Sequence, residues 1–97
     1  MEVRDNPEEL RYELVDEGHM LGEILYRRYP DRIVLVHTEV PPAREGEGLA
    51  TRLVAGALDD IRAKGLRMVP VCPFVRGYLR RHPEYQDLVT ADLQVSD

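Results

Sequence analysis

The sequence has few of the features that mark secreted, membrane-spanning or metal-binding proteins. Its single cysteine, Cys72, excludes a disulfide within the chain. No segment approaches the roughly 18 consecutive apolar residues of a membrane helix. The start, MEVRDNPEEL, lacks the basic and then apolar run of a signal peptide. We therefore expect a reduced, cytoplasmic protein. The isolated histidines His37 and His82 supply too few ligands for a metal, so none is expected.

Positive charge is also scarce. The 97 residues carry 18 acidic and 13 basic side chains, which gives a formal net charge of −5. An acidic chain has no general electrostatic attraction for phosphate backbones or anionic lipids. This balance argues against nucleic acid and membrane surfaces as partners.

The length of the chain predicts a single domain spanning residues 1–97, because little sequence is left for a second core. Residues 1–8 contain charge, Asn6 and Pro7 but no apolar pattern. We expect this end, and the end at residues 90–97, to be loosely ordered.

Apolar patterning predicts an α/β fold with a mixed sheet. Three β-rich runs, residues 11–15, 20–29 and 32–40, are expected to form an antiparallel N-terminal meander. Alternation along the third run places its side chains on two faces: Val34, Val36 and Thr38 on one, and Ile33, Leu35, His37 and Glu39 on the other.

A β-α-β unit and a short C-terminal helix complete the expected fold. Apolar residues recur every four positions within 47–64, which predicts an amphipathic helix that ends at Gly65. The strand at 66–72 is expected to lie parallel to the third run, because a helix joins the two. Pro73 suits the first position of a further helix, and Pro83 ends it.

The glycine turn between the third run and the first helix is a candidate anion site. Gly46 and Gly48 precede a helix whose first N–H groups have no partner within the helix. The turn lacks the Gly-Lys-Ser/Thr of a Walker loop and the G-x-G-x-x-G of a dinucleotide loop. On this pattern alone, the glycines could equally serve as a tight connection.

Four short motifs resemble one family. EGEGLA, residues 45–50, is similar to the acetyl-CoA motif of GNAT acetyltransferases, Arg/Gln-x-x-Gly-x-Gly/Ala. Gly48 and Ala50 match its last two fixed positions, whereas Glu45 replaces the first. HTEVP, P-x-CPF and HPEY follow the order found in minimal single-domain GNAT-like N-acetyltransferases. The resemblance implies a GNAT-type fold, whose sheet is splayed between two parallel strands to hold acetyl-CoA.

The same resemblance implies the residues that bind acetyl-CoA. Backbone atoms of Val40 and Pro41, next to Glu39, would border the pantetheine, and Arg44 and Arg76 would approach the outer phosphates. The turn and the helix start would hold the pyrophosphate through Gly46, Glu47, Gly48, Ala50 and Thr51. Because a carboxylate at Glu45 repels phosphate, we expect backbone N–H groups to bind it.

Two chemical routes remain open for acetyl transfer. Cys72, at a helix N-terminus, could accept the acetyl group as a thiolate, or it could be a small buried apolar residue. In direct transfer, His37 or Glu39 would act as the base toward the amine. Tyr78 resembles the family's tyrosine near the leaving thiolate, and it could also be a core aromatic.

We therefore predict an N-acetyltransferase that uses acetyl-CoA as cosubstrate and a small-molecule or protein amine as acceptor. The alternative is a noncatalytic CoA-binding or protein-interaction module with the same fold. Both a monomer and a homodimer are compatible with the sequence.

Overall fold

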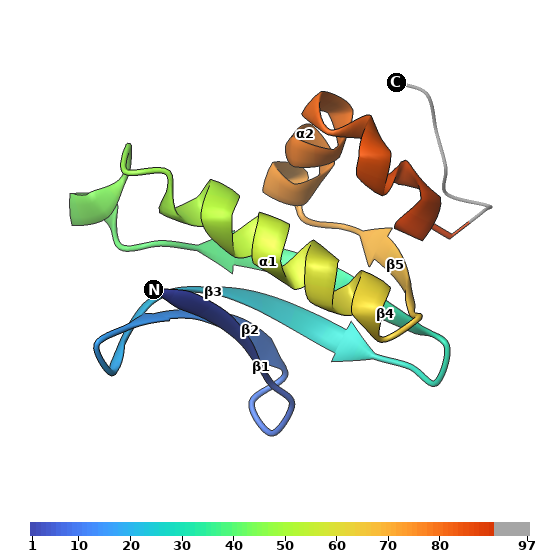
Figure 1. Ribbon diagram of the computed structural model, residues 1–97, viewed down its shortest axis with the longest axis horizontal. Helices are drawn as coiled ribbons and strands as arrows, with labels where there is room; N and C mark the ends of the chain where they lie inside the picture. The colour runs from blue at the N-terminus through green and yellow to red at the C-terminus, as the bar shows by residue number, and fades with distance from the viewer. Residues whose placement is uncertain (91–97) are drawn as a thin grey trace.

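A single mixed sheet forms the centre of the computed structural model, which describes residues 1–90 (Figure 1). Its strands lie in chain order, β1-β2-β3-β4-β5; the first four are antiparallel, and β5 is parallel to β4. This arrangement confirms the predicted α/β fold class. The elements are β1 (Glu2–Asn6), β2 (Arg11–Asp16), β3 (His19–Arg28), β4 (Arg32–Glu39), η1 (Pro42–Arg44), α1 (Leu49–Ala63), β5 (Arg67–Pro70), α2 (Pro73–Arg81) and η2 (Pro83–Leu88).

Strand β1 corrects the prediction of a loose N-terminal end. It pairs with β2 from Glu2 opposite Val15 to Asn6 opposite Arg11. The strand has no apolar alternation because it lies at the edge of the sheet, where Val3 alone packs on the core. The other predicted loose end, residues 90–97, lies outside the described residues except for Thr90.

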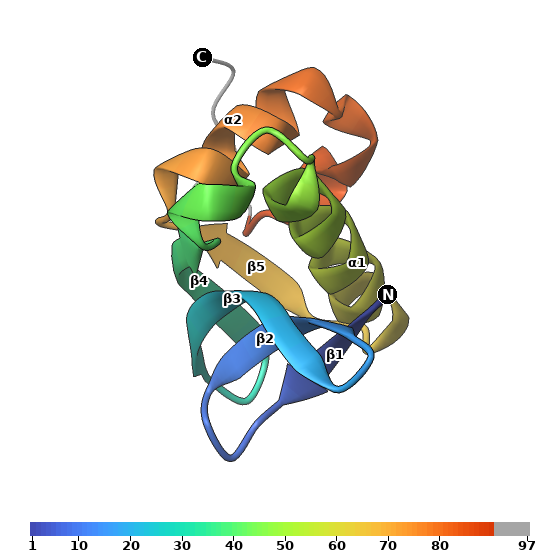
Figure 2. The same cartoon turned by 90° about the vertical axis from the view of Figure 1, so that its left-hand side faces the viewer.

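Helix α1 packs along one face of the sheet, and α2 lies beside β4 and β5 (Figure 2). The buried stripe of α1, which includes Leu53, Ala57 and Ile61, packs against the core side chains of β2, β3 and β4. The helix begins at Leu49, two positions after the predicted start, because Gly46 and Gly48 have φ angles of 91° and 75° that no helix accepts. No helix within residues 1–90 is long and apolar enough to cross a membrane.

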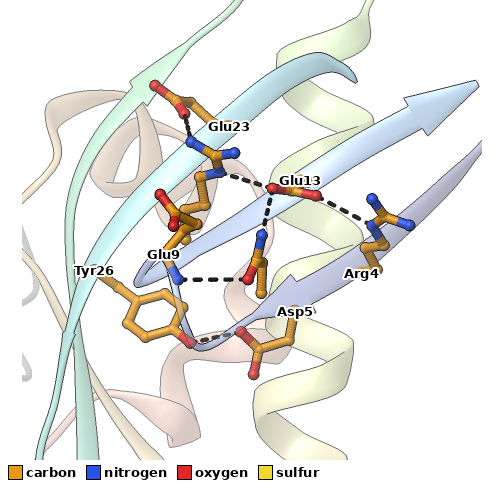
Figure 3. Close-up of polar contacts among 8 residues, drawn as sticks. Arg4, Asp5, Glu9, Glu13, Glu23 and Tyr26 are labelled. Carbon is orange, nitrogen blue, oxygen red and sulfur yellow. Dashed lines mark hydrogen bonds and ion pairs between the residues drawn. The ribbon is translucent and has the colours of Figure 1, made fainter. Parts of the chain in front are cut away.

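On the face of the sheet away from α1, the carboxylate of Glu13 is only 3% exposed. It accepts hydrogen bonds from Asn6 (2.9 Å), Arg11 (2.7 Å) and Arg4 (3.1 Å), as Figure 3 shows. The Asn6 amide and the two guanidinium groups hold the pKa of Glu13 at about 2, well below its usual 4.5. This cluster joins β1 to β2 across the sheet.

Strands β4 and β5 separate beyond Leu35, as the predicted splay requires. Their parallel pairing ends at Leu35 opposite Pro70. The Leu35 carbonyl then accepts the N–H groups of Val71 (3.0 Å) and Cys72 (2.9 Å). After these bonds the chain turns into α2, while β4 continues to Glu39. The last residues of β4 therefore have no β5 residue beside them.

A bulge at Val36 reverses the predicted alternation in this part of β4. Leu25 of β3 lies opposite His37, but the next residue, Tyr26, lies opposite Leu35, so Val36 is the extra residue. As a result, the prediction that Leu35 and His37 share a face is wrong.

Thr38 consequently lies on the core side of β4, opposite the fully buried Ile24. His37 and Glu39 share the other face, as predicted, with Glu39 opposite Glu23. The bulge therefore places a hydroxyl on one side of the free strand and a histidine with a carboxylate on the other.

Candidate active site

A hollow lies where β4 and β5 separate. This open pocket has a volume of about 790 Å³. Its walls are the last residues of β4, the loop leading to α1, the first turn of α1, and Phe74 of α2. One pocket thus joins the free end of a strand to the start of a helix.

The helix end of the pocket is suited to an anion. Gly48, the N-cap of α1, has a left-handed backbone and no side chain, so no side-chain hydrogen bond caps the helix. The N–H groups of Leu49, Ala50 and Thr51 belong to this first turn, where the helix dipole is positive. A methyl group at Gly46 or Gly48 would meet no atom within 4 Å, so positive φ rather than space requires glycine there.

The strand end of the pocket carries polar groups on both faces of β4. On the outer face, His37 Nε2 lies 3.4 Å from Glu39 Oε2, and these side chains are 55% and 65% exposed. On the core face, the half-buried Thr38 places Oγ1 3.2 Å from the Sγ of Cys72. The exposed imidazole and carboxylate are accessible to a substrate, whereas the thiol is 2% exposed and does not line the pocket.

Residues 11–88 match the family described as GCN5-related N-acetyl-transferase. The chain belongs to this family. It is 36% identical over 66 residues to Protein NATD1 of Gallus gallus and of Mus musculus, a match that covers 67% of this chain and 60% of each relative. The NMR solution structure of a GCN5-like protein from Staphylococcus aureus superposes with a TM-score of 0.65 at 27% identity, over 91% of this chain and 86% of that one. The predicted GNAT resemblance and fold are confirmed.

In this GCN5-related N-acetyltransferase fold, the pocket brings together most of the residues predicted to bind acetyl-CoA or to act in catalysis. Those that line it are His37, Glu39, Val40, Arg44, Gly46, Gly48, Ala50 and Thr51. Pro41 and Glu47 belong to the same loop but are not among its walls, and Arg76 lies on the exposed side of α2.

Tyr78 is not among the residues that line the pocket. It is 4% exposed, and its ring stacks on that of His82 with 4.0 Å between centroids. Burial raises the pKa of its phenol. This position corresponds to the core-aromatic alternative of the sequence analysis.

In the loop that leads to α1, the arginine is already paired with an acidic side chain. Arg44, predicted to approach phosphates, is paired with Glu47 through Nη2 and Oε1 at 2.9 Å. The hydrogen bond from Arg44 lowers the pKa of Glu47, and the same bond raises that of Arg44. Glu45 lines the pocket as well. The side chains of the loop therefore add little positive charge, and the backbone N–H groups remain the main attraction for an anion.

Three pocket residues were not selected from the sequence: Thr38, Leu49 and Phe74. Leu49 belongs to the apolar stripe that predicts the helix. Phe74 belongs to the CPF motif, and the expected position of that motif beside the splay is the sequence signal that could have identified Phe74 as a pocket residue. The sequence does not identify Thr38. Uninterrupted alternation places its side chain on the same face of the strand as Val36, whereas the bulge puts it on the core face.

Proposed function

We propose that the protein is an acetyl-CoA-dependent N-acetyltransferase that transfers the acetyl group by direct attack of an amine. One observation carries this proposal: the uncapped start of α1 and the free end of β4 open into the same 790 Å³ pocket. Such a pocket suits an elongated donor with phosphates at one end and a reactive group at the other.

The residues present fit this cosubstrate. Backbone N–H groups from Gly46 to Thr51 would hold the pyrophosphate, and backbone groups of Glu39 and Val40 at the unpaired strand would hold the pantetheine. When bound, acetyl-CoA supplies an activated acetyl thioester. Phe74, which is 37% exposed beside the pocket, offers apolar contact to its chain.

We assign the site of the amine acceptor to the outer face of β4. There His37, oriented by Glu39, would take a proton from the attacking amine. The thiol of Cys72 is buried behind Thr38, an arrangement that favours direct attack over an acetylated cysteine. In this proposal Cys72 and Tyr78 act through packing and orientation rather than as reactants.

Thiol release from acetyl-CoA in the presence of primary amines tests the proposal. We expect His37→Gln to lower kcat about 100-fold, the usual contribution of a general base. His19→Gln changes an exposed histidine at the start of β3, outside the pocket, and should retain wild-type turnover. Cys72→Ser should also retain most of the turnover. Loss of turnover in Cys72→Ser, together with an acetyl adduct on wild-type Cys72, would contradict direct attack.

A noncatalytic CoA-binding module is the second candidate. It is favoured by the exposure of the candidate bases His37 and Glu39, whose side chains are 55% and 65% exposed, because a solvated base is held less firmly against an amine. Calorimetry separates the two functions. Binding of CoA without turnover of any amine supports the module, and absence of CoA binding at millimolar concentration rejects both.

A further inference from the structure

Thr38 holds a position that the reaction described above leaves unexplained. Its hydroxyl lies on the core side of β4, at the point where the sheet has opened and the pocket begins. The side chain lines the pocket and is only half-buried. Its oxygen contacts the Cys72 sulfur across the gap between β4 and α2, at 3.2 Å. The hydroxyl therefore faces a buried thiol on one side and an open cavity on the other.

The thiol is a fixed partner for this hydroxyl. The Cys72 N–H donates to the Leu35 carbonyl at 2.9 Å, and the Cys72 carbonyl accepts the N–H of Arg76 at 3.1 Å. Cys72 is thus bonded to β4 on one side and to the first turn of α2 on the other. Its side chain is 2% exposed. Little freedom remains for the sulfur to turn away from Thr38.

Either atom can donate in the contact between Thr38 and Cys72, and one of the two arrangements leaves a donor for the pocket. A threonine hydroxyl has one O–H and two acceptor lone pairs, and a thiol has one weak S–H donor. When the S–H donates to Thr38 Oγ1, the threonine O–H is free to donate elsewhere. The pocket is the open side of that hydroxyl, so a carbonyl oxygen bound there would be its natural acceptor.

We propose that Thr38 recognises the acyl group of the donor by donating a hydrogen bond to the thioester carbonyl, and that Cys72 orients the hydroxyl. This inference rests on the proposed function. The phosphates of the donor would occupy the start of α1, so its acyl end would lie at the opposite end of the pocket, where Thr38 is. Thr38 would then distinguish acetyl-CoA from free CoA.

Calorimetric titration with acetyl-CoA and with CoA, in the absence of amine, tests this assignment. We expect Thr38→Val to weaken acetyl-CoA binding about tenfold, the effect of one lost hydrogen bond, and to change CoA affinity less than about twofold. Thr38→Ser keeps the hydroxyl and should preserve the preference for acetyl-CoA. Cys72→Ala should reduce that preference in part, because the hydroxyl loses its orienting partner.

Thr90→Val is the matched control, because it makes the same threonine-to-valine change at a position outside the pocket. Thermal unfolding of each variant checks that it is folded. Equal losses for both ligands in Thr38→Val, or no loss for either, would overturn the role of Thr38 while leaving the proposed function intact. If the wild type binds neither ligand, the proposed function itself fails, and this inference fails with it.

Discussion

Glu13 is a buried charged residue that depends on its neighbours for hydrogen bonds. Its carboxylate is almost fully buried and is bonded to Asn6, Arg11 and Arg4 (Figure 3). We predict that Glu13→Gln lowers the free energy of unfolding at pH 7 by about 1.5–3 kcal/mol, the range for hydrogen bonds to a charged group. Urea denaturation measures this loss. Glu8→Gln, at an exposed position, should leave stability unchanged.

The same carboxylate makes stability depend on pH. Its folded pKa of about 2 lies below the usual 4.5, so its contribution is complete above pH 4.5 and is lost as the pH falls toward 2. Urea midpoints measured between pH 7 and pH 2.5 should therefore fall more steeply for the wild type than for Glu13→Gln. Parallel curves for the two proteins would show that Glu13 is not the titrating group.

Single residues also show how far the sequence could predict the site. Gly46, Gly48 and His37 were found because a motif or a chemical type marks them, and all three line the pocket. Thr38 was not found, because its orientation depends on one extra residue in β4, Val36. A bulge forms from the register of two strands, and no local pattern in HTEVP encodes that register.

Helix α1 and strand β1 pack so closely that a residue on one limits the side chains allowed on the other. A methyl group at Gly56 would lie 2.5 Å from Cγ2 and 2.6 Å from Cβ of Val3. Although alanine favours helix over glycine by about 1 kcal/mol, this clash should outweigh the gain. We predict that Gly56→Ala destabilises the protein by about 1–2 kcal/mol in urea denaturation.

The sign of this effect should reverse when the clash is removed. In a Val3→Gly background, Gly56→Ala should stabilise by up to about 1 kcal/mol, because only the helix preference remains. Gly77→Ala in α2 is the matched control, since its new methyl would come no closer than 3.6 Å, to Arg81 Nη1. Stabilisation by both alanine substitutions in the wild type would mean that β1 does not pack closely on α1.

Most of the helices and strands can be predicted from the sequence. The β4-α1-β5 unit and the start of α2 at Pro73 follow from period changes and from proline and glycine positions, and the structure confirms them. Strand β1 was missed because its pairing is made by the backbone, while its side chains are mainly charged. Edge strands with a single apolar contact leave almost no periodic signal.

For the whole molecule, the pocket joins β4, α1 and α2, so a ligand there should hold the fold together. Under the proposed function, CoA at about 100 times its Kd adds about 2.7 kcal/mol of stability, which corresponds to a rise in Tm of roughly 10 °C or more. Differential scanning calorimetry measures the shift. Glu45→Gln should enlarge it at low salt, because a carboxylate beside the phosphate site is removed.

Salt and a distant charge serve as controls for this prediction. Glu8→Gln changes the net charge of −5 equally but lies outside the pocket, so it should give the wild-type shift. The advantage of Glu45→Gln should shrink at 1 M salt, where the screening length is only about 3 Å. Equal shifts for all three proteins would indicate that the acidic side chain does not face the phosphates.

Strand β1 has a further consequence for the behaviour of the protein at high concentration. A sheet that ended at β2 would offer a longer apolar edge to other chains, and exposed edges are templates for aggregation. Instead the outermost strand carries Glu2, Arg4 and Asp5 beside its half-buried Val3. Charged side chains on an edge resist the approach of a second strand. The charged composition that conceals β1 in the sequence should therefore disfavour the addition of another strand at this edge of the sheet.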